Sequence, residues 1–440
     1  MKNQVTDLLA GAGKLDITPT FPVGLGGYRA PENRIFKEIR DRLYLTCTAV
    51  REGETTLLIF TADTQNWGLA MVEEARQQIS AATGVPENNM FFGATHTHTA
   101  PAMRSEAESS QQYKAFFLAA AVKAAETALA DLAPAKASYG SMQVENMNFV
   151  RHYVHNDGRF SGSNFNEELP KDTITGHTTE ADKQLILVKF AREGKPDILL
   201  VNWQAHPDVV PEVKFKVVSG GQPVYMVSQL EEKTGMIVSY FSGAEGNLNP
   251  CSWIEAEDPG LLMDAYGKKM AEYALQVLEN MTPVEGTAIR AARKPVTIAI
   301  NHGWDHMLAE AREIRAIHET EGRDTATAAG LKYNFSSAYH ANAILARVNM
   351  PQSDETEVGA FAIGNLGFIS GTYEMFCENG MFVKEHSPFP TTFVITGNWQ
   401  YIPSKGAHDY RCYEADCGPY ARGVAEQLAD EFVSLLNDLK

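Results

Sequence analysis

The stretch that decides the fold is residues 90–101, which read MFFGATHTHTAP. Its apolar start is typical of a short buried strand, and the glycine and proline around the polar part indicate a loop. Residues two apart in an extended chain point the same way, so His96 and His98 can face a common point. Because zinc binds imidazole nitrogens at about 2.1 Å, this pair is a candidate for metal binding. A polar loop whose histidines bind nothing is the alternative.

Composition and charge narrow the class of protein. The chain has 440 residues, of which 44% are hydrophobic and 21% are charged, as in soluble globular proteins with a large core. A net charge of −17 leaves no basic stripe to neutralise phosphates, so we expect no nucleic-acid partner. Five cysteines, an odd and low number, argue against a disulfide framework. The first residues lack the apolar run of a signal peptide, and no run of roughly 18 apolar residues occurs, so we predict a cytoplasmic protein.

The chain contains two similar series of expected elements. Each begins with a hairpin of β-branched and aromatic residues that turns at Arg-Glu-Gly, and each later reaches a strand followed by glycine and alanine. A long helix closes each series. The first series has strands near 43–50, 57–60 and 90–92 and helices near 68–83 and 110–132; the second has strands near 183–190, 198–201 and 240–241 and a helix near 260–279.

These series predict an internal repeat, roughly 40–150 and 180–300, of a duplicated ββαβ-type unit. We expect an α/β fold: one layered domain over 1–440, with two similar mixed β-sheets packed together and helices outside. Chance similarity between two common hairpins is the alternative. Residues 301–440 contain a third hairpin pattern and a last helix, and we expect them to complete the metal site. The glycine-rich residues 11–28 lack the end of a phosphate loop, so we expect tight turns there.

Polar side chains follow most of these strands. They are Asp63, the His96 and His98 pair, His206, Glu374 and Tyr401. In open α/β sheets ligands gather outside the carboxyl ends of strands, so we expect these side chains to meet. Taken singly, each is typical of a hydrogen-bonded or exposed loop residue. Together, two histidines, a carboxylate and an open position for water suit a catalytic zinc site.

Competing motifs are less consistent with the sequence. His302 and His306 have helical spacing, but the glutamate of His-Glu-x-x-His is missing. Thr99 and Ala100 stand where metallo-β-lactamases place Asp-His. The turn at 246–250 has no serine at its tip, so a serine nucleophile has no obvious position there.

Over nearly its whole length the chain resembles the N-terminal catalytic domain of the neutral/alkaline, non-lysosomal ceramidases. The resemblance rests on residues 11–19, on residues 94–101, on the Asn202-Trp203 strand before His206 and on residues 410–419. It implies one zinc ion per chain, held by His96, His206, Glu374 and Tyr401. It also implies that His98 and Tyr413 contact the scissile group and that Arg151 binds substrate.

Three departures from the family pattern affect the expected chemistry. The family serine in an Asn-x-Ser-Pro turn is Asn249 here, which we place among the substrate-binding residues. The family Gly-Glu-Phe is Tyr373-Glu374-Met375, and we expect no immunoglobulin-like C-terminal domain. We therefore predict a zinc-dependent hydrolase that attacks the amide C–N bond of a small polar substrate with metal-activated water. A zinc-dependent ester or lactone hydrolase, or an inactive metal-binding protein that binds a ligand, are the alternatives.

The remaining expectations concern the roles of Asp63 and Arg151 and the partners of the protein. Asp63 either orients a ligand histidine from behind or accepts structural hydrogen bonds. Arg151 either fixes a substrate carboxylate or takes part in a structural ion pair.

The helices near 68–83, 260–279 and 419–436 carry acidic residues, so anionic lipid heads should repel them, and we expect no stable membrane association. The sequence predicts no particular oligomeric state.

Overall fold

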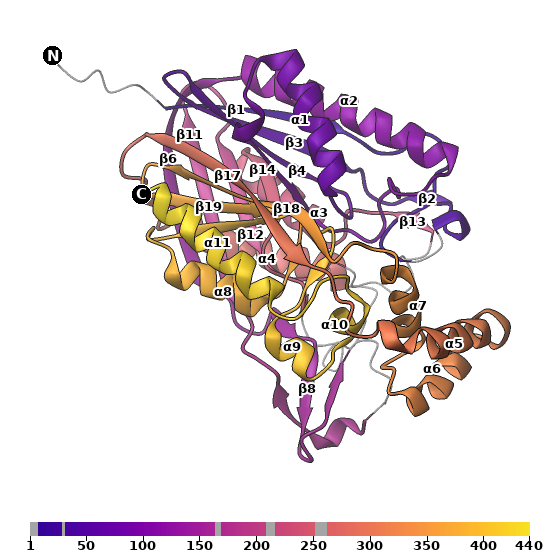
Figure 1. Ribbon diagram of the computed structural model, residues 1–440. Coiled ribbons are helices and arrows are strands. Elements are labelled where there is room, and N and C mark those ends of the chain that lie inside the picture. The colour runs from indigo at the N-terminus through magenta and orange to yellow at the C-terminus, as the bar shows by residue number, and fades with distance from the viewer. Residues whose placement is uncertain (1–7, 29–30, 163–168, 208–215, 251–261) are drawn as a thin grey trace.

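The computed structural model describes residues 8–28, 31–162, 169–207, 216–250 and 262–440, whose arrangement is shown in Figure 1. Strands and helices alternate along the chain in a mixed α/β fold, as the sequence predicts. Across these ranges no helix is long and apolar enough to cross a membrane. The four cysteines within them are free: Cys47, Cys377, Cys412 and Cys417.

The first unit of the fold is an antiparallel hairpin followed by a parallel strand. Strand β3 pairs antiparallel with both β1 and β4, while β4 pairs parallel with β5. Helices α1 and α2 cover the outer face. The elements are β1 (Leu9–Asp16), β3 (Tyr44–Glu52), β4 (Thr55–Ala62), α1 (Leu69–Thr83), β5 (Met90–Ala94) and α2 (Glu108–Ala130).

The second unit repeats this order, which supports the similarity seen in the sequence. Strand β11 pairs antiparallel with β6 and β12, and β12 pairs parallel with β14. Its elements are β6 (Ala133–Gln143), β11 (Gln184–Arg192), β12 (Ile198–Trp203), α3 (Gln222–Thr234), β14 (Ile237–Ser242) and α4 (Leu262–Leu278). The helix expected near 260–279 thus starts at Leu262, and residues 260 and 261 lie outside the described ranges.

The two units do not form two separate sheets. A short pairing of β1 with β6 joins them into one nine-stranded sheet of order β14-β12-β11-β6-β1-β3-β4-β5, in which β16 (Thr282–Pro283) also pairs with β6. The expected layering of two similar sheets is therefore not confirmed.

A third unit with the same order of elements forms the other large sheet. Its strand order is β17-β18-β19-β21, with β19 and β21 parallel. The elements are β17 (Ile289–Ala299), β18 (Ser353–Ile363), β19 (Leu366–Gly371), α8 (Cys377–His386), β21 (Thr392–Thr396) and α11 (Val424–Asp438). The last parallel strands of the three units, β5, β14 and β21, contact one another. The fold therefore contains three similar units around a common centre, one more than the repeat read from the sequence.

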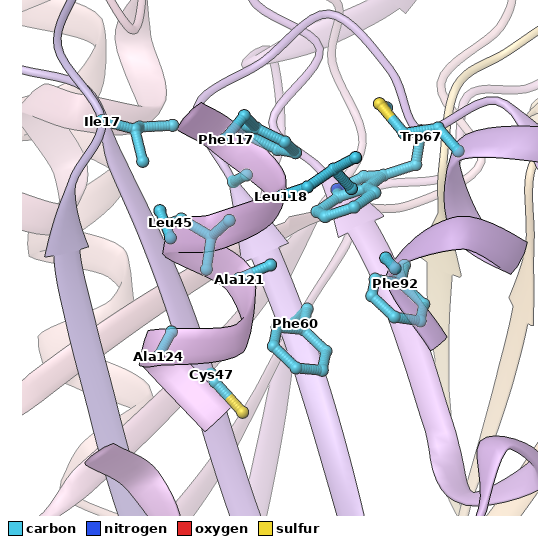
Figure 2. Close-up of a cluster of buried hydrophobic side chains, with 14 of the residues drawn as sticks. Ile17, Leu45, Cys47, Phe60, Trp67, Phe92, Phe117, Leu118, Ala121 and Ala124 are labelled. Carbon is cyan, nitrogen blue, oxygen red and sulfur yellow. The ribbon is translucent and has the colours of Figure 1, made fainter. Parts of the chain in front are cut away.

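The central core lies where the three units meet. Its buried side chains come from strands of every unit; for example, the Phe361 ring lies 4.4 Å from Phe91 and 4.2 Å from Phe368, measured between centroids. Further cores lie under the outer helices of each unit. Figure 2 shows the one in the first unit, where Trp67 packs against Phe92 and Phe117. Because the Trp67 indole also donates to the Gly93 carbonyl oxygen at 3.1 Å, this core fixes the end of β5.

Two of the glycines near the start of the chain, Gly11 and Gly13, lie in strand β1 and not in the expected turns, whereas Gly26 and Gly27 lie in a bend. Helix α2 crosses β1 so closely that a Cβ added at Gly11 or Gly13 would lie 2.2 Å from a helix carbonyl oxygen, that of Ala128 or Ala124. Glycine marks such close approaches because it has no side chain to obstruct them. These residues therefore set the distance between strand and helix.

The remaining elements are insertions and short pairings near the ends of the strands. Helices α5 to α7 project from one side, and the β8 hairpin region projects at the bottom of Figure 1. The short strands are β2 (Glu38–Ile39), β7 (Asn148–Val150), β8 (His152–His155), β9 (Phe160–Gly162), β10 (Ile174–His177), β13 (Val217–Val218), β15 (Leu248–Pro250), β20 (Glu374–Met375) and β22 (Tyr401–Ile402). The further helices are α5 (Leu308–Glu321), α6 (Arg323–Gly330), α7 (Ala338–Arg347), α9 (Lys405–Asp409) and α10 (Tyr413–Cys417).

Candidate metal centre

The predicted metal ligands come together at the carboxyl ends of strands from all three units. His96 follows β5 of the first unit and His206 follows β12 of the second. Glu374 and Tyr401 follow β19 and β21 of the third unit and face each other as Cα partners in the β20–β22 pair. His96 has φ of 63°, a left-handed conformation that is uncommon outside glycine and typical of functional sites.

The donor atoms of these residues have the spacing that a tetrahedral ion requires. His96 Nε2 lies 3.2 Å from His206 Nε2 and 3.5 Å from Glu374 Oε2. His206 Nε2 lies 3.7 Å from Glu374 Oε2 and 3.4 Å from the Tyr401 hydroxyl. Donors about 2.1 Å from a tetrahedral zinc ion lie about 3.4 Å from one another. These four separations are close to that value, and we call the group of four side chains the cage.

The protonation of the two imidazoles also favours a cation between them. His96 Nδ1 donates to the Gln65 carbonyl oxygen at 2.7 Å, and His206 Nδ1 donates to the Glu245 carbonyl oxygen at 3.0 Å. A carbonyl can only accept, so both Nε2 atoms of the neutral rings present lone pairs and cannot hydrogen-bond to each other. Among the described residues Glu374 Oε2 is buried and makes no hydrogen bond, and it lies 3.5 Å from His96 Nε2. With both rings neutral, three buried acceptors face one another, which a bound cation or an added proton would satisfy.

Ionisation in the metal-free site follows from the same contacts. Burial alone would lower the pKa of His96, but the Glu374 carboxylate outweighs burial and raises that pKa to about 9. Burial, together with the positive charge of Arg151, holds the pKa of His206 well below its usual range. One proton on His96 thus supplies a positive charge where a metal ion would supply it.

His98 lies beside this cage. Its Nε2 atom is 3.2 Å from His96 Nε2, and its ring meets the edge of Tyr28 at 5.1 Å between centroids. His96, His98 and His206 offer nitrogen atoms within 4.8 Å of one another, so His98 is near enough to be a ligand or to contact a substrate held there.

Arg151 reaches the cage from the side through a buried ionic network. Its guanidinium donates to Glu414 at 2.9 and 2.5 Å, to the Tyr401 hydroxyl at 3.2 Å and to Asn249 Oδ1 at 3.5 Å. The other Glu414 oxygen lies 3.1 Å from His152 Nε2. Burial would raise the pKa of Glu414, but Arg151 and His152 hold it well below its usual range. The carboxylate therefore stays ionised and fixes the orientation of Arg151.

His152, Cys412 and Glu414 form a second buried group whose atoms lie close enough for a metal ion. Its oxygen atoms are already used, since Glu414 accepts from Arg151 and His152. His152 Nδ1 lies 2.9 Å from the Tyr410 hydroxyl. Burial raises the pKa of the Cys412 thiol, which disfavours the thiolate that a metal would need. We interpret this group as support for Arg151.

Two further predicted residues lie on neighbouring elements. Tyr413 begins α10, which contacts the β22 strand of Tyr401, and its ring lies 6.0 Å from that of Tyr339. Asp63 is buried after β4, and its Oδ2 accepts from the Tyr44 N–H at 2.8 Å. The nitrogens that orient His96 and His206 are held by main-chain carbonyls, so in this structure those carbonyls do what was expected of Asp63.

Sequence reasoning missed two buried residues beneath the cage. Asn398 follows β21, has φ of 54°, and donates through Nδ2 to Glu245 Oε1 at 3.2 Å. Burial raises the pKa of Glu245 to about 8. Glu245 and Asn398 follow their strands as His96 follows β5, so the rule that located His96 also applies to them.

No family model matches the chain, and no match was found among curated proteins. Solved structures do match. The neutral ceramidase of Pseudomonas aeruginosa superposes with a TM-score of 0.74 at 16% sequence identity, over 99% of this chain and 75% of that one. A structure described as a ceramidase complexed with C2 gives a TM-score of 0.73 at 16% identity, over 99% and 76%.

Proposed function

We propose that this chain, which has the fold of the neutral ceramidases, is a zinc-dependent hydrolase that cleaves the amide C–N bond of a small polar substrate. The observation that carries the proposal is the cage of His96, His206, Glu374 and Tyr401, whose donors have tetrahedral spacing. Glu374 Oε2, which is buried and makes no hydrogen bond to a described residue, and the two Nε2 atoms that face it support a cation there.

When bound there, zinc would polarise a carbonyl group and activate water for attack on it. The protein's part is to hold the two imidazole rings in one tautomer. The carbonyl oxygens of Gln65 and Glu245 keep the Nδ1 protons of His96 and His206, so both Nε2 atoms stay available. Contacts of this kind also fix the ring orientation and raise ligand basicity.

His98 and Tyr413 are the proposed donors to the oxyanion that develops on the substrate. His98 lies beside the cage, and Tyr413 is half-buried at the start of α10. A donor in this role contributes about 3–4 kcal/mol to the stabilisation of a transition state. Arg151 would hold the Tyr401 hydroxyl and the Asn249 amide in place and contact the substrate through its remaining surface.

Asn249 argues for direct attack by water. Its amide accepts from Arg151 Nη1 at 3.5 Å and cannot serve as a nucleophile, so we expect no acyl-enzyme. Esters and lactones offer the same carbonyl chemistry and remain alternative substrates. The alternative to an enzyme, which we call the rival, is a metal-binding protein that binds a ligand but does not turn it over. In that case Asn249 would be the change that ended catalysis.

Metal content and a substrate panel test the proposal together. The protein is purified without added metal and analysed for zinc alongside His206→Ala and a matched control, His302→Ala. We expect about one zinc ion per chain in the unmodified protein and the control, and much less in His206→Ala. Full zinc in His206→Ala would contradict the cage.

Activity is assayed separately on short N-acyl amides, esters, lactones and long-chain ceramide, with and without chelator. Chelator-sensitive turnover of a small amide supports the proposed enzyme. Preferred turnover of long-chain ceramide would contradict the small-substrate part. If no compound in the panel is turned over although zinc is present and a ligand binds, the result would favour the metal-binding protein without catalytic activity.

A further inference from the structure

A separate cavity of about 400 Å³ lies between the first and second units. Strands β3 and β4 form one wall, and helix α3 with strand β14 forms the other. None of the four proposed metal ligands lines it. Its volume is in the range of small-molecule sites, and it contains Asp63, a buried acid that the proposed reaction does not use.

The charges in this cavity do not balance. Lys14 Nζ is paired with Glu231 Oε1 at 2.7 Å, and that oxygen also accepts from the Val238 N–H at 3.1 Å. Asp63 is the second carboxylate in the lining; it accepts from the neutral N–H of Tyr44, and the charge of Lys14 also acts on it. The lining residues therefore carry one negative charge more than they carry positive charges.

The uncharged part of the lining is amphipathic. Ser239 Oγ is buried in the wall and makes no hydrogen bond with any residue that the structure describes. Leaving such a hydroxyl without a partner is unfavourable, so a ligand that hydrogen-bonds to it would gain affinity. Val224, Val227 and Val238 supply apolar surface to the same lining.

We propose that this cavity binds a small organic cation that carries hydroxyl groups, with its ammonium group toward Asp63 and a hydroxyl toward Ser239. The excess carboxylate selects the positive charge, and the unpartnered hydroxyl selects a hydrogen-bonding neighbour. Thr95 lines the cavity and precedes His96, so the ligand would lie directly behind the metal cage. The proposal does not depend on the proposed hydrolysis.

The test compares two probes of nearly the same shape, protonated Tris and neutral pentaerythritol. Binding to the full chain is measured near neutral pH by ligand-detected saturation-transfer NMR. We expect Tris to bind about tenfold more tightly than pentaerythritol, and Asp63→Asn to remove that preference. Val227→Trp, which fills the cavity, should abolish binding of Tris, while Gln229→Trp on the same helix but outside the lining should not.

Equal binding of the two probes to the unmodified protein would overturn the proposal, and this comparison requires no variant to fold. Retention of Tris by Val227→Trp would also overturn it, because it would place the probe elsewhere, such as at the metal cage. Loss of Tris with Gln229→Trp as well as with Val227→Trp would contradict the location on α3.

Discussion

Acidification from pH 9 to pH 7 should weaken metal binding by about fiftyfold. In the metal-free protein the pKa of His96 is about 9, so at pH 7 His96 carries a proton on the nitrogen that must face the metal. Metal binding has to expel this proton, and affinity therefore falls by up to about tenfold for each pH unit below the pKa of His96. Because half of the rings are already protonated at pH 9, the fall is about fiftyfold, which corresponds to about 2.3 kcal/mol. The pKa of His206 lies well below this range, so His206 adds nothing to the effect.

The assay is competition with a chromophoric chelator across this pH range, together with calorimetry in two buffers of different ionisation enthalpy. Calorimetry should count about one proton released per zinc ion near pH 7, from His96. A second released proton would indicate that Tyr401 binds as phenolate, since burial raises the pKa of its hydroxyl. In Glu374→Gln the acid that raises the pKa of His96 is gone, so the released fraction should fall.

His302→Ala is the control, because His302 lies away from the cage and contacts Asp305 and the Pro351 carbonyl. Its pH dependence should match that of the unmodified protein. A zinc affinity that does not change between pH 7 and pH 9, or binding without proton release, would refute the proposed protonation of the cage.

Three other outcomes follow from the structure. Glu414→Gln should lower the free energy of unfolding by about 3–5 kcal/mol in urea denaturation, because it leaves the buried Arg151 without its carboxylate. Adding Arg151→Met should recover part of that loss. Strictly additive effects of the two substitutions would contradict the pairing. Asn249→Ala should retain turnover, and mass spectrometry of quenched reactions should find no covalent adduct; trapping one would contradict direct attack by water. Gly13→Val should lower the thermal midpoint sharply, since its Cβ would meet the Ala124 carbonyl oxygen, and an unchanged midpoint would contradict the contact between β1 and α2.

The sequence was sufficient for the local elements and for the meeting of polar side chains at strand ends. Alternating and apolar runs located β3, β4, β11 and β12, because each carries its own pattern. The rule that polar residues gather at strand ends predicted that His96, His206 and Glu374 would meet, and their donor atoms lie close together; that they bind zinc stays a proposal.

The pairing of strands that are far apart in the sequence could not be predicted in the same way. The two units join through a pairing of only Leu9 with Pro134 and Ala10 with Ala133, which leaves no periodic signal. The third unit was obscured because helices α5 to α7 separate β17 from its partner β18. Glu414 resembles any other acid until its buried partners are known, and the sequence alone left the two roles of Asp63 open.

The metal cage takes its donors from three units, so a bound ion would act as a cross-link. His96 and His206 are 110 residues apart, and Glu374 lies further along the chain. No single unit holds more than two of the four donors, so an isolated fragment should bind zinc weakly. An ion at a hundred times its dissociation constant stabilises the folded chain by about 2.7 kcal/mol. Zinc starvation would then loosen the contacts between units, and such a protein would respond to metal supply through its lifetime as well as its activity.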